Sequence, residues 1–90
     1  MKCYLISYDL RKTRNYEALY EAIKSFGTWG KINESTWIIG SYQSAVQIRD
    51  YLLNFIDSDD RLFIVKSDRE AAWQNVMADN QWLKNTLSNR

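Results

Sequence analysis

The sequence predicts an α+β fold, a ferredoxin-like βαββαβ sandwich with two helices on one face of a four-stranded antiparallel sheet and a helical C-terminal tail. Two observations predict it. Four segments rich in β-branched and aromatic residues are interrupted by two segments of helical periodicity, in the order β-α-β-β-α-β. The chain has 90 residues, which is room for one domain. We therefore expect a single domain over residues 1–90, with the tail beginning near residue 69.

Both helices are predicted by apolar spacing and by signals at their ends. We expect the first over residues 15–26, followed by Gly27 at the position where glycine commonly ends a helix. The second is expected over residues 44–56, because Ser44 and Gln47 match the capping box S-x-x-Q. Apolar residues recur at helical spacing and mark the buried faces: Tyr16, Leu19, Tyr20, Ile23 and Phe26 in the first, and Ala45, Ile48, Leu52, Phe55 and Ile56 in the second.

Four strands are expected, at residues 2–9, 28–32, 36–40 and 61–66. The first is apolar on both faces, which is typical of a central strand. The polar residues 33–35 predict a turn that joins the second and third strands into a hairpin.

The tail after the fourth strand has weaker periodicity. We expect a short helix at Ala71 to Trp73, and a last helical turn or two at Trp82, Leu83 and Leu87. The second face of the sheet needs cover, which either the tail or a second subunit would supply. The chain has four Trp, six Tyr and three Phe, and aromatic side chains are enriched at interfaces. We therefore expect a homodimer.

Composition excludes several function classes. The chain has no histidine and one cysteine, Cys3, so histidine-based catalysis and thiolate zinc sites are excluded. It has no glycine-rich phosphate loop, and its net charge is +1. No apolar run approaches the ~20 residues of a membrane span, and we expect no signal peptide from the first residues, Met1 to Tyr4. We expect a cytoplasmic protein with no membrane partner, since a lone cysteine fits a reducing compartment.

Asp9 is the carboxylate with the clearest functional context. It ends the first strand and is followed by Arg11, Lys12 and Arg14. A carboxylate at a strand end can hold Mg²⁺ while basic neighbours hold phosphate, an arrangement suited to phosphodiester cleavage. The alternative is that Asp9 accepts hydrogen bonds from backbone amides of the following loop, and that the basic residues are simply solvated.

A second acidic group comprises Asp57, Asp59 and Asp60, in the loop before the fourth strand. It lacks the glycine and glutamate of a calcium-binding EF-hand loop, so calcium is unsupported. We interpret it as a solvated turn.

The opening segment, Tyr4-Leu5-Ile6-Ser7-Tyr8-Asp9-Leu10, resembles the first strand of the CRISPR-associated small endonucleases and of the virulence-associated protein D ribonucleases. Over nearly the whole chain the sequence is similar to short bacterial and phage proteins labelled the SinR family. Besides the opening segment, four further segments carry that likeness: Phe26-Gly27-Thr28, Ser35-Thr36-Trp37-Ile38, Ile48-Arg49-Asp50 and Glu70-Ala71-Ala72-Trp73.

This resemblance implies a ferredoxin-like homodimer, in which strand-end aspartates of two subunits face each other and share a metal. Asp9 is the residue that matches by position. The expected site would then contain Asp9 as catalytic residue and Mg²⁺ ligand, with Arg11, Lys12 and Arg14 on nucleic acid and the hydroxyls of Ser7 and Ser35 behind the carboxylate. The C-terminus departs from the pattern, because the family ends in a fifth strand and Trp82 to Asn85 look helical here.

Two functions from different classes follow. The first is a Mg²⁺-dependent nuclease, acting on RNA rather than DNA. The second is a non-catalytic homodimeric module that binds nucleic acid or a protein, as a phage or toxin–antitoxin regulator would. The distance between the two Asp9 side chains discriminates them, since one carboxylate per chain is a poor metal site unless a dimer pairs it.

Overall fold

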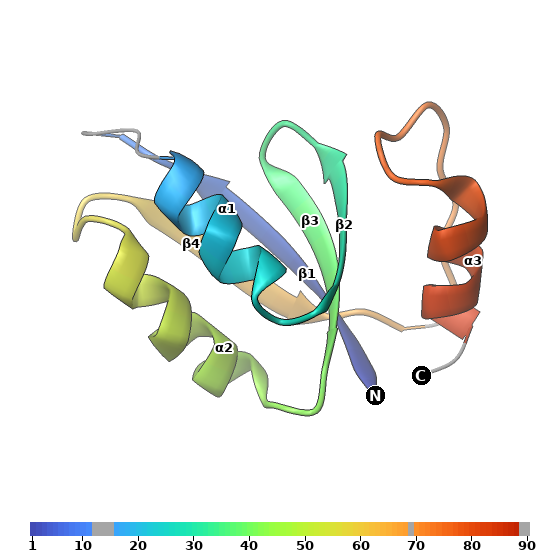
Figure 1. Ribbon diagram of the computed structural model, residues 1–90, viewed down its shortest axis with the longest axis horizontal. Helices are drawn as coiled ribbons and strands as arrows, with labels where there is room; N and C mark the ends of the chain where they lie inside the picture. Colours follow the sequence, from blue (N-terminus) through green and yellow to red (C-terminus); the bar gives the residue numbers. More distant parts are fainter. Residues whose placement is uncertain (12–15, 69, 89–90) are drawn as a thin grey trace.

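The computed structural model describes residues 1–11, 16–68 and 70–88 of the chain. Within them, four strands and three α-helices form an α+β domain (Figure 1). The elements are β1 (Lys2–Asp9), α1 (Tyr16–Lys24), β2 (Thr28–Asn33), β3 (Thr36–Ser41), α2 (Ala45–Leu52), a 3₁₀ turn η1 (Leu53–Phe55), β4 (Arg61–Lys66) and α3 (Asn80–Ser88). In the described residues, no helix is both long and apolar enough to cross a membrane.

The four strands form one antiparallel sheet in the order β2-β3-β1-β4. As expected, β1 is a central strand, flanked by β3 and β4. This arrangement is compatible with a ferredoxin-like type of fold. The register places Asp9, the last residue of β1, directly opposite Arg61, the first residue of β4.

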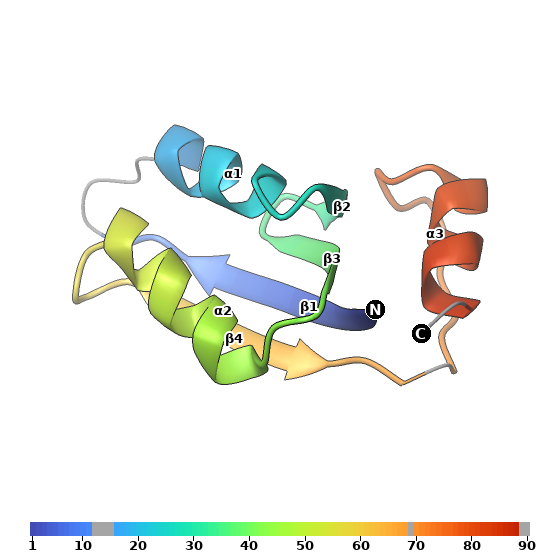
Figure 2. The same cartoon turned by 60° about the horizontal axis from the view of Figure 1, so that its bottom comes forward.

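The main core lies between the sheet and helices α1 and α2, which cover the same face (Figures 1 and 2). Alternate residues of β1, namely Tyr4, Ile6 and Tyr8, point into it because successive strand side chains face opposite sides. Helix α2 begins with the predicted capping box: the Ser44 hydroxyl accepts from the Gln47 amide, and the Gln47 side chain accepts from the Ser44 amide.

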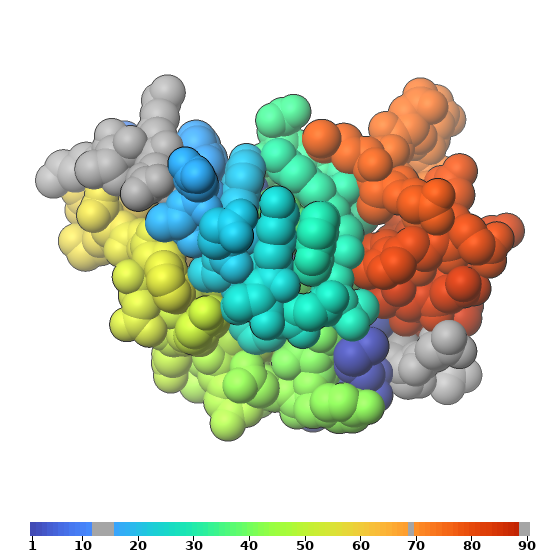
Figure 3. All heavy atoms as spheres, viewed as in Figure 1, coloured from blue at the N-terminus to red at the C-terminus, as the bar shows by residue number. Residues whose placement is uncertain are grey.

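A smaller cluster lies on the opposite face, under α3. Its buried members are Cys3, Ile38, Leu83 and Leu87. The tail packs beside β2 (Figures 2 and 3). Through the contacts of this cluster it covers one end of the opposite face. Phe63 of β4 remains 61% exposed.

The structure corrects the expected helix at Ala71 to Trp73. Residues 70–79 contain no helix or strand. The segment instead runs along the edge of β2, where the Met77 amide donates to the Ile32 carbonyl at 2.9 Å. This bond satisfies the Met77 amide at the sheet edge instead of within a helix.

The two long helices are also shorter than expected. Helix α1 ends at Lys24 rather than residue 26, and a turn leads into Gly27, whose φ of 90° favours glycine. Helix α2 ends at Leu52, and the tighter turn η1 takes the chain through Phe55.

Candidate functional site

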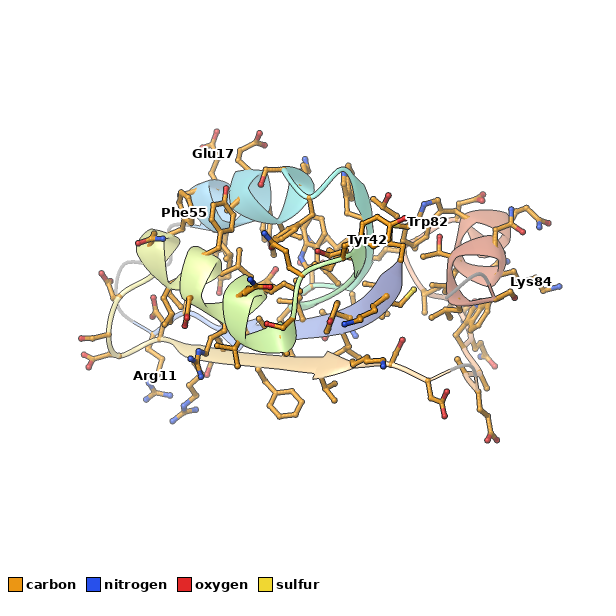
Figure 4. The ribbon with its side chains drawn as sticks, turned by 90° about the horizontal axis from the view of Figure 1, so that it is seen from below. Arg11, Glu17, Tyr42, Phe55, Trp82 and Lys84 are labelled. Atoms are coloured by element: carbon orange, nitrogen blue, oxygen red, sulfur yellow. The ribbon has the colours of Figure 1, made fainter. Side chains whose placement is uncertain are left out.

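Asp9 lies in a cluster with two arginines, which we call the arginine cluster (Asp9, Arg11 and Arg61). The Arg61 Nη1 donates to Asp9 Oδ2 at 3.2 Å, and the Arg11 Nη1 lies 3.7 Å from the same oxygen. All three side chains are exposed, at 56% for Asp9, 49% for Arg11 and 67% for Arg61. Arg11 extends from the face of the sheet opposite α1 and α2 (Figure 4).

The acidic loop positions Arg11. Asp60 Oδ1 accepts a hydrogen bond from the Arg11 backbone amide at 2.6 Å, and Asp60 Oδ2 accepts from the Asp57 amide at 2.8 Å. One carboxylate therefore joins the loop after β1 to the loop before β4. The sequence predicted a solvated turn here, and the structure gives Asp60 a specific bridging role.

A pocket of about 410 Å³ opens at the same end of β1. It forms there because the Tyr8 amide donates to the Ser35 carbonyl at 3.2 Å, which brings the β2–β3 turn against β1. We call it the tyrosine pocket, and it is lined by Tyr8, Asp9, Tyr16, Tyr20, Glu34 and Ser35.

Three tyrosine rings form the aromatic part of this pocket. The ring centroid of Tyr8 lies 6.2 Å from the ring centroids of both Tyr16 and Tyr20. The centroids of Tyr16 and Tyr20 lie 5.9 Å apart. Tyr8 is buried, whereas Tyr16 and Tyr20 are half-buried and retain accessible surface.

Hydrogen bonds orient the buried tyrosine. Tyr8 Oη accepts from the Trp37 Nε1 at 2.9 Å and donates to the Glu34 carbonyl at 3.2 Å. Burial raises the pKa of the Tyr8 phenol above its ordinary value, and the neighbouring Tyr20 raises it further, while the bond from Trp37 acts in the opposite direction. The phenol is therefore neutral at physiological pH and serves as a fixed hydrogen-bonding group.

The predicted site residues are brought together in part. Asp9 and Arg11 lie in the arginine cluster, and Ser35 lies beside Asp9 in the tyrosine pocket. Ser7 lies two residues before Asp9 on the same strand, opposite Thr36, and does not line this pocket. Lys12 and Arg14 lie outside the described residues.

Sequence reasoning missed Arg61 and the tyrosines. Arg61 is 52 residues from Asp9, and only the β1–β4 register makes them neighbours. Tyr16 and Tyr20 were assigned to the core by their helical spacing. Their position in the first turns of α1, next to a strand end, was the one signal of a different role.

The residues around Asp9 do not fit a Mg²⁺ site within one chain. Mg²⁺ takes oxygen ligands, and the Asp9 carboxylate instead faces two guanidinium groups. Within the ranges that the structure describes, no three Asp, Glu, Cys or His side chains gather as metal ligands would.

Comparison with models of known protein families and with curated proteins gave no match. The function is therefore inferred from the geometry of the site.

Proposed function

We propose that this domain binds nucleic acid through the arginine cluster, with the guanidinium groups of Arg11 and Arg61 on the phosphate backbone. One observation carries the proposal: both groups converge on a single oxygen of Asp9 at an exposed end of the sheet. Guanidinium groups match phosphate oxygens in geometry and charge. Asp9 holds the two cations close together before a phosphate arrives.

The charge of the whole chain supports binding of phosphate at the arginine cluster rather than over a broad basic surface. The net charge is +1, so nonspecific attraction over the whole surface is weak. The arginine cluster itself has two positive charges against one negative charge. Lys12 and Arg14 follow Arg11 in the sequence, and we propose that they add to the phosphate contact.

The test is binding of short labelled RNA and DNA at several salt concentrations. We expect Arg11→Ala and Arg61→Ala each to weaken binding and to reduce the salt slope by about one unit, because each removes about one phosphate contact. Arg49→Ala is the matched control, since this exposed arginine pairs with Asp50 on α2. Absence of binding, or equal loss in the Arg49→Ala control, would reject the proposal.

We assign the fold to the ferredoxin-like type. The strand order β2-β3-β1-β4 and the two helices on one face support this assignment.

A second candidate function is a Mg²⁺-dependent nuclease acting on RNA, of the CRISPR-associated or virulence-associated protein D type. The exposed carboxylate of Asp9 at a strand end supports it. Because the described residues of one chain do not supply a metal site, this candidate requires a homodimer that brings two Asp9 side chains together. Exposed Phe63 and Val65 on β4, a strand paired on one side alone in the described sheet, support association of two copies.

Cleavage of RNA and DNA by wild type and Asp9→Asn, with Mg²⁺ and with EDTA, tests the second candidate. Asn is nearly isosteric with Asp, so the fold should survive while a metal ligand is lost. A nuclease of this kind should lose at least ~100-fold in activity. Cleavage that Asp9→Asn leaves intact, or no wild-type cleavage with any metal, would rule it out.

Sedimentation at micromolar concentration tests the homodimer. We expect wild type to sediment as a dimer and Phe63→Asp as a monomer, because a buried unpaired charge opposes association. Met77→Asp, at an exposed apolar residue of the tail, is the control and should stay dimeric. A wild-type monomer would remove the dimer and the shared metal site together.

A further inference from the structure

We propose that the tyrosine pocket holds one unpaired nucleobase, so that the preferred ligand is single-stranded nucleic acid. This inference rests on the proposed nucleic-acid binding and names its substrate class. Its basis is that three tyrosine rings and the phosphate-binding arginines lie at the same end of β1, with Asp9 common to both sites.

The pocket has the size and lining of a site for a planar group. Its volume of about 410 Å³ lies within the range of small-ligand pockets. Tyr16 and Tyr20 are half-buried, are tilted by 44° to each other and both line the pocket. Bases stack on such rings whatever their sequence, which is how single-strand-binding proteins gain affinity.

A second cation is a poorer occupant than a base. Aromatic cages also attract ammonium and guanidinium groups. Here the Lys31 Nζ already lies 4.4 Å from the Tyr20 ring centroid and donates to the Tyr20 hydroxyl at 3.2 Å. An arginine or lysine of a peptide partner would meet this resident charge, whereas a neutral base would not.

The polar lining favours particular bases. Asp9, Glu34 and Ser35 offer mainly hydrogen-bond acceptors. Adenine, cytosine and guanine have exocyclic amino groups that donate to such acceptors, and uracil has none. Single strands rich in the first three bases should therefore bind more tightly than a uracil strand.

The position of Asp9 between the two sites explains why the bound nucleic acid must be single-stranded. Arg11 and Arg61 hold a phosphate on one side of this residue, and the pocket opens on the other. A base reaches the pocket from that phosphate only when it is unstacked and unpaired, as in a loop or a single strand.

The experiment measures binding in EDTA, where metal-dependent cleavage is absent. The probes are short adenine, cytosine and uracil RNA strands and an RNA duplex. We expect Tyr16→Leu to weaken binding of the adenine and cytosine strands by about tenfold, with no change for the duplex, because it removes one stacking surface. Tyr16→Phe keeps the ring and should bind as wild type does.

Tyr42→Leu is the matched control, because Tyr42 is 83% exposed and lies far along the chain from the pocket. If Arg11→Ala and Arg61→Ala weaken binding but Tyr16→Leu does not, the pocket inference fails and the proposed function stands. If no probe binds, both fail. Displacement of RNA by an arginine-rich peptide that needs Tyr16 would overturn the base assignment in favour of a protein partner. Thermal unfolding of Tyr16→Leu and Tyr16→Phe verifies that both variants remain folded.

Discussion

Gly30 of β2 lies directly against the indole ring of Trp82, a residue of α3. A Cβ atom at Gly30 would lie 2.8 Å from Trp82 Cη2 and closer still to Cζ3. Carbon atoms in contact lie about 3.5–4.0 Å apart, so a side chain at residue 30 would collide with Trp82. Helix α3 can therefore pack against β2 in this position because residue 30 is glycine.

Gly30→Ala should therefore loosen α3. Overpacking of this kind typically costs about 1–3 kcal/mol in the free energy of unfolding. Urea denaturation measures the cost, and amide hydrogen exchange should locate the lost protection in residues 80–88. In a Trp82→Ala background the same substitution should cost much less. Equal costs in both backgrounds would show that the contact with Trp82 is unimportant.

Tyr8→Phe should destabilise the domain although it keeps the ring. The substitution removes the acceptor of the Trp37 Nε1 hydrogen bond, and Trp37 is buried. Leaving a buried donor without its partner costs about 1–3 kcal/mol. Chemical denaturation measures this loss. Tyr42→Phe, at an exposed position, should have no effect, and a similar loss there would contradict the explanation.

Stability should decline at alkaline pH through the ionisation of Tyr8. Its folded-state pKa is raised, so its contribution is fully present below the unfolded pKa of about 10 and is lost as pH rises further. Unfolding free energies measured from neutral to strongly alkaline pH should fall in this window. In Tyr8→Phe the decline should be shallower. Ultraviolet absorbance should also show one tyrosine ionising after the others.

Asp60→Ala should weaken RNA binding without altering the arginines themselves. It removes the acceptor that holds the Arg11 amide, so Arg11 loses its attachment to the loop before β4. We expect a smaller loss of affinity than in Arg11→Ala. Asp60→Asn retains one acceptor oxygen and should fall between wild type and Asp60→Ala. Unchanged binding in all three variants would contradict this positioning role.

Local patterns in the sequence determined the four strands, helices α1 and α2, and the capping box of Ser44 and Gln47. Each of these depends on residues a few positions apart, so periodicity and end signals predict them. They also placed Asp9 at the end of β1, with Arg11 just beyond it. The helix predicted at residues 71–73 is not formed, and the segment 70–79 that contains these residues is bonded to the edge of a distant strand through the Met77 amide.

Only the tertiary structure decided what surrounds Asp9. Arg61 meets it through strand register, Asp60 holds Arg11 across two loops, and Tyr8 packs with tyrosines from α1. Register depends on how the whole hydrophobic face is buried, and a shift of one residue would move each side chain of the strand to the other face. Local patterns therefore specify which segments form strands and helices, whereas packing of the whole chain sets which side chains meet at their ends.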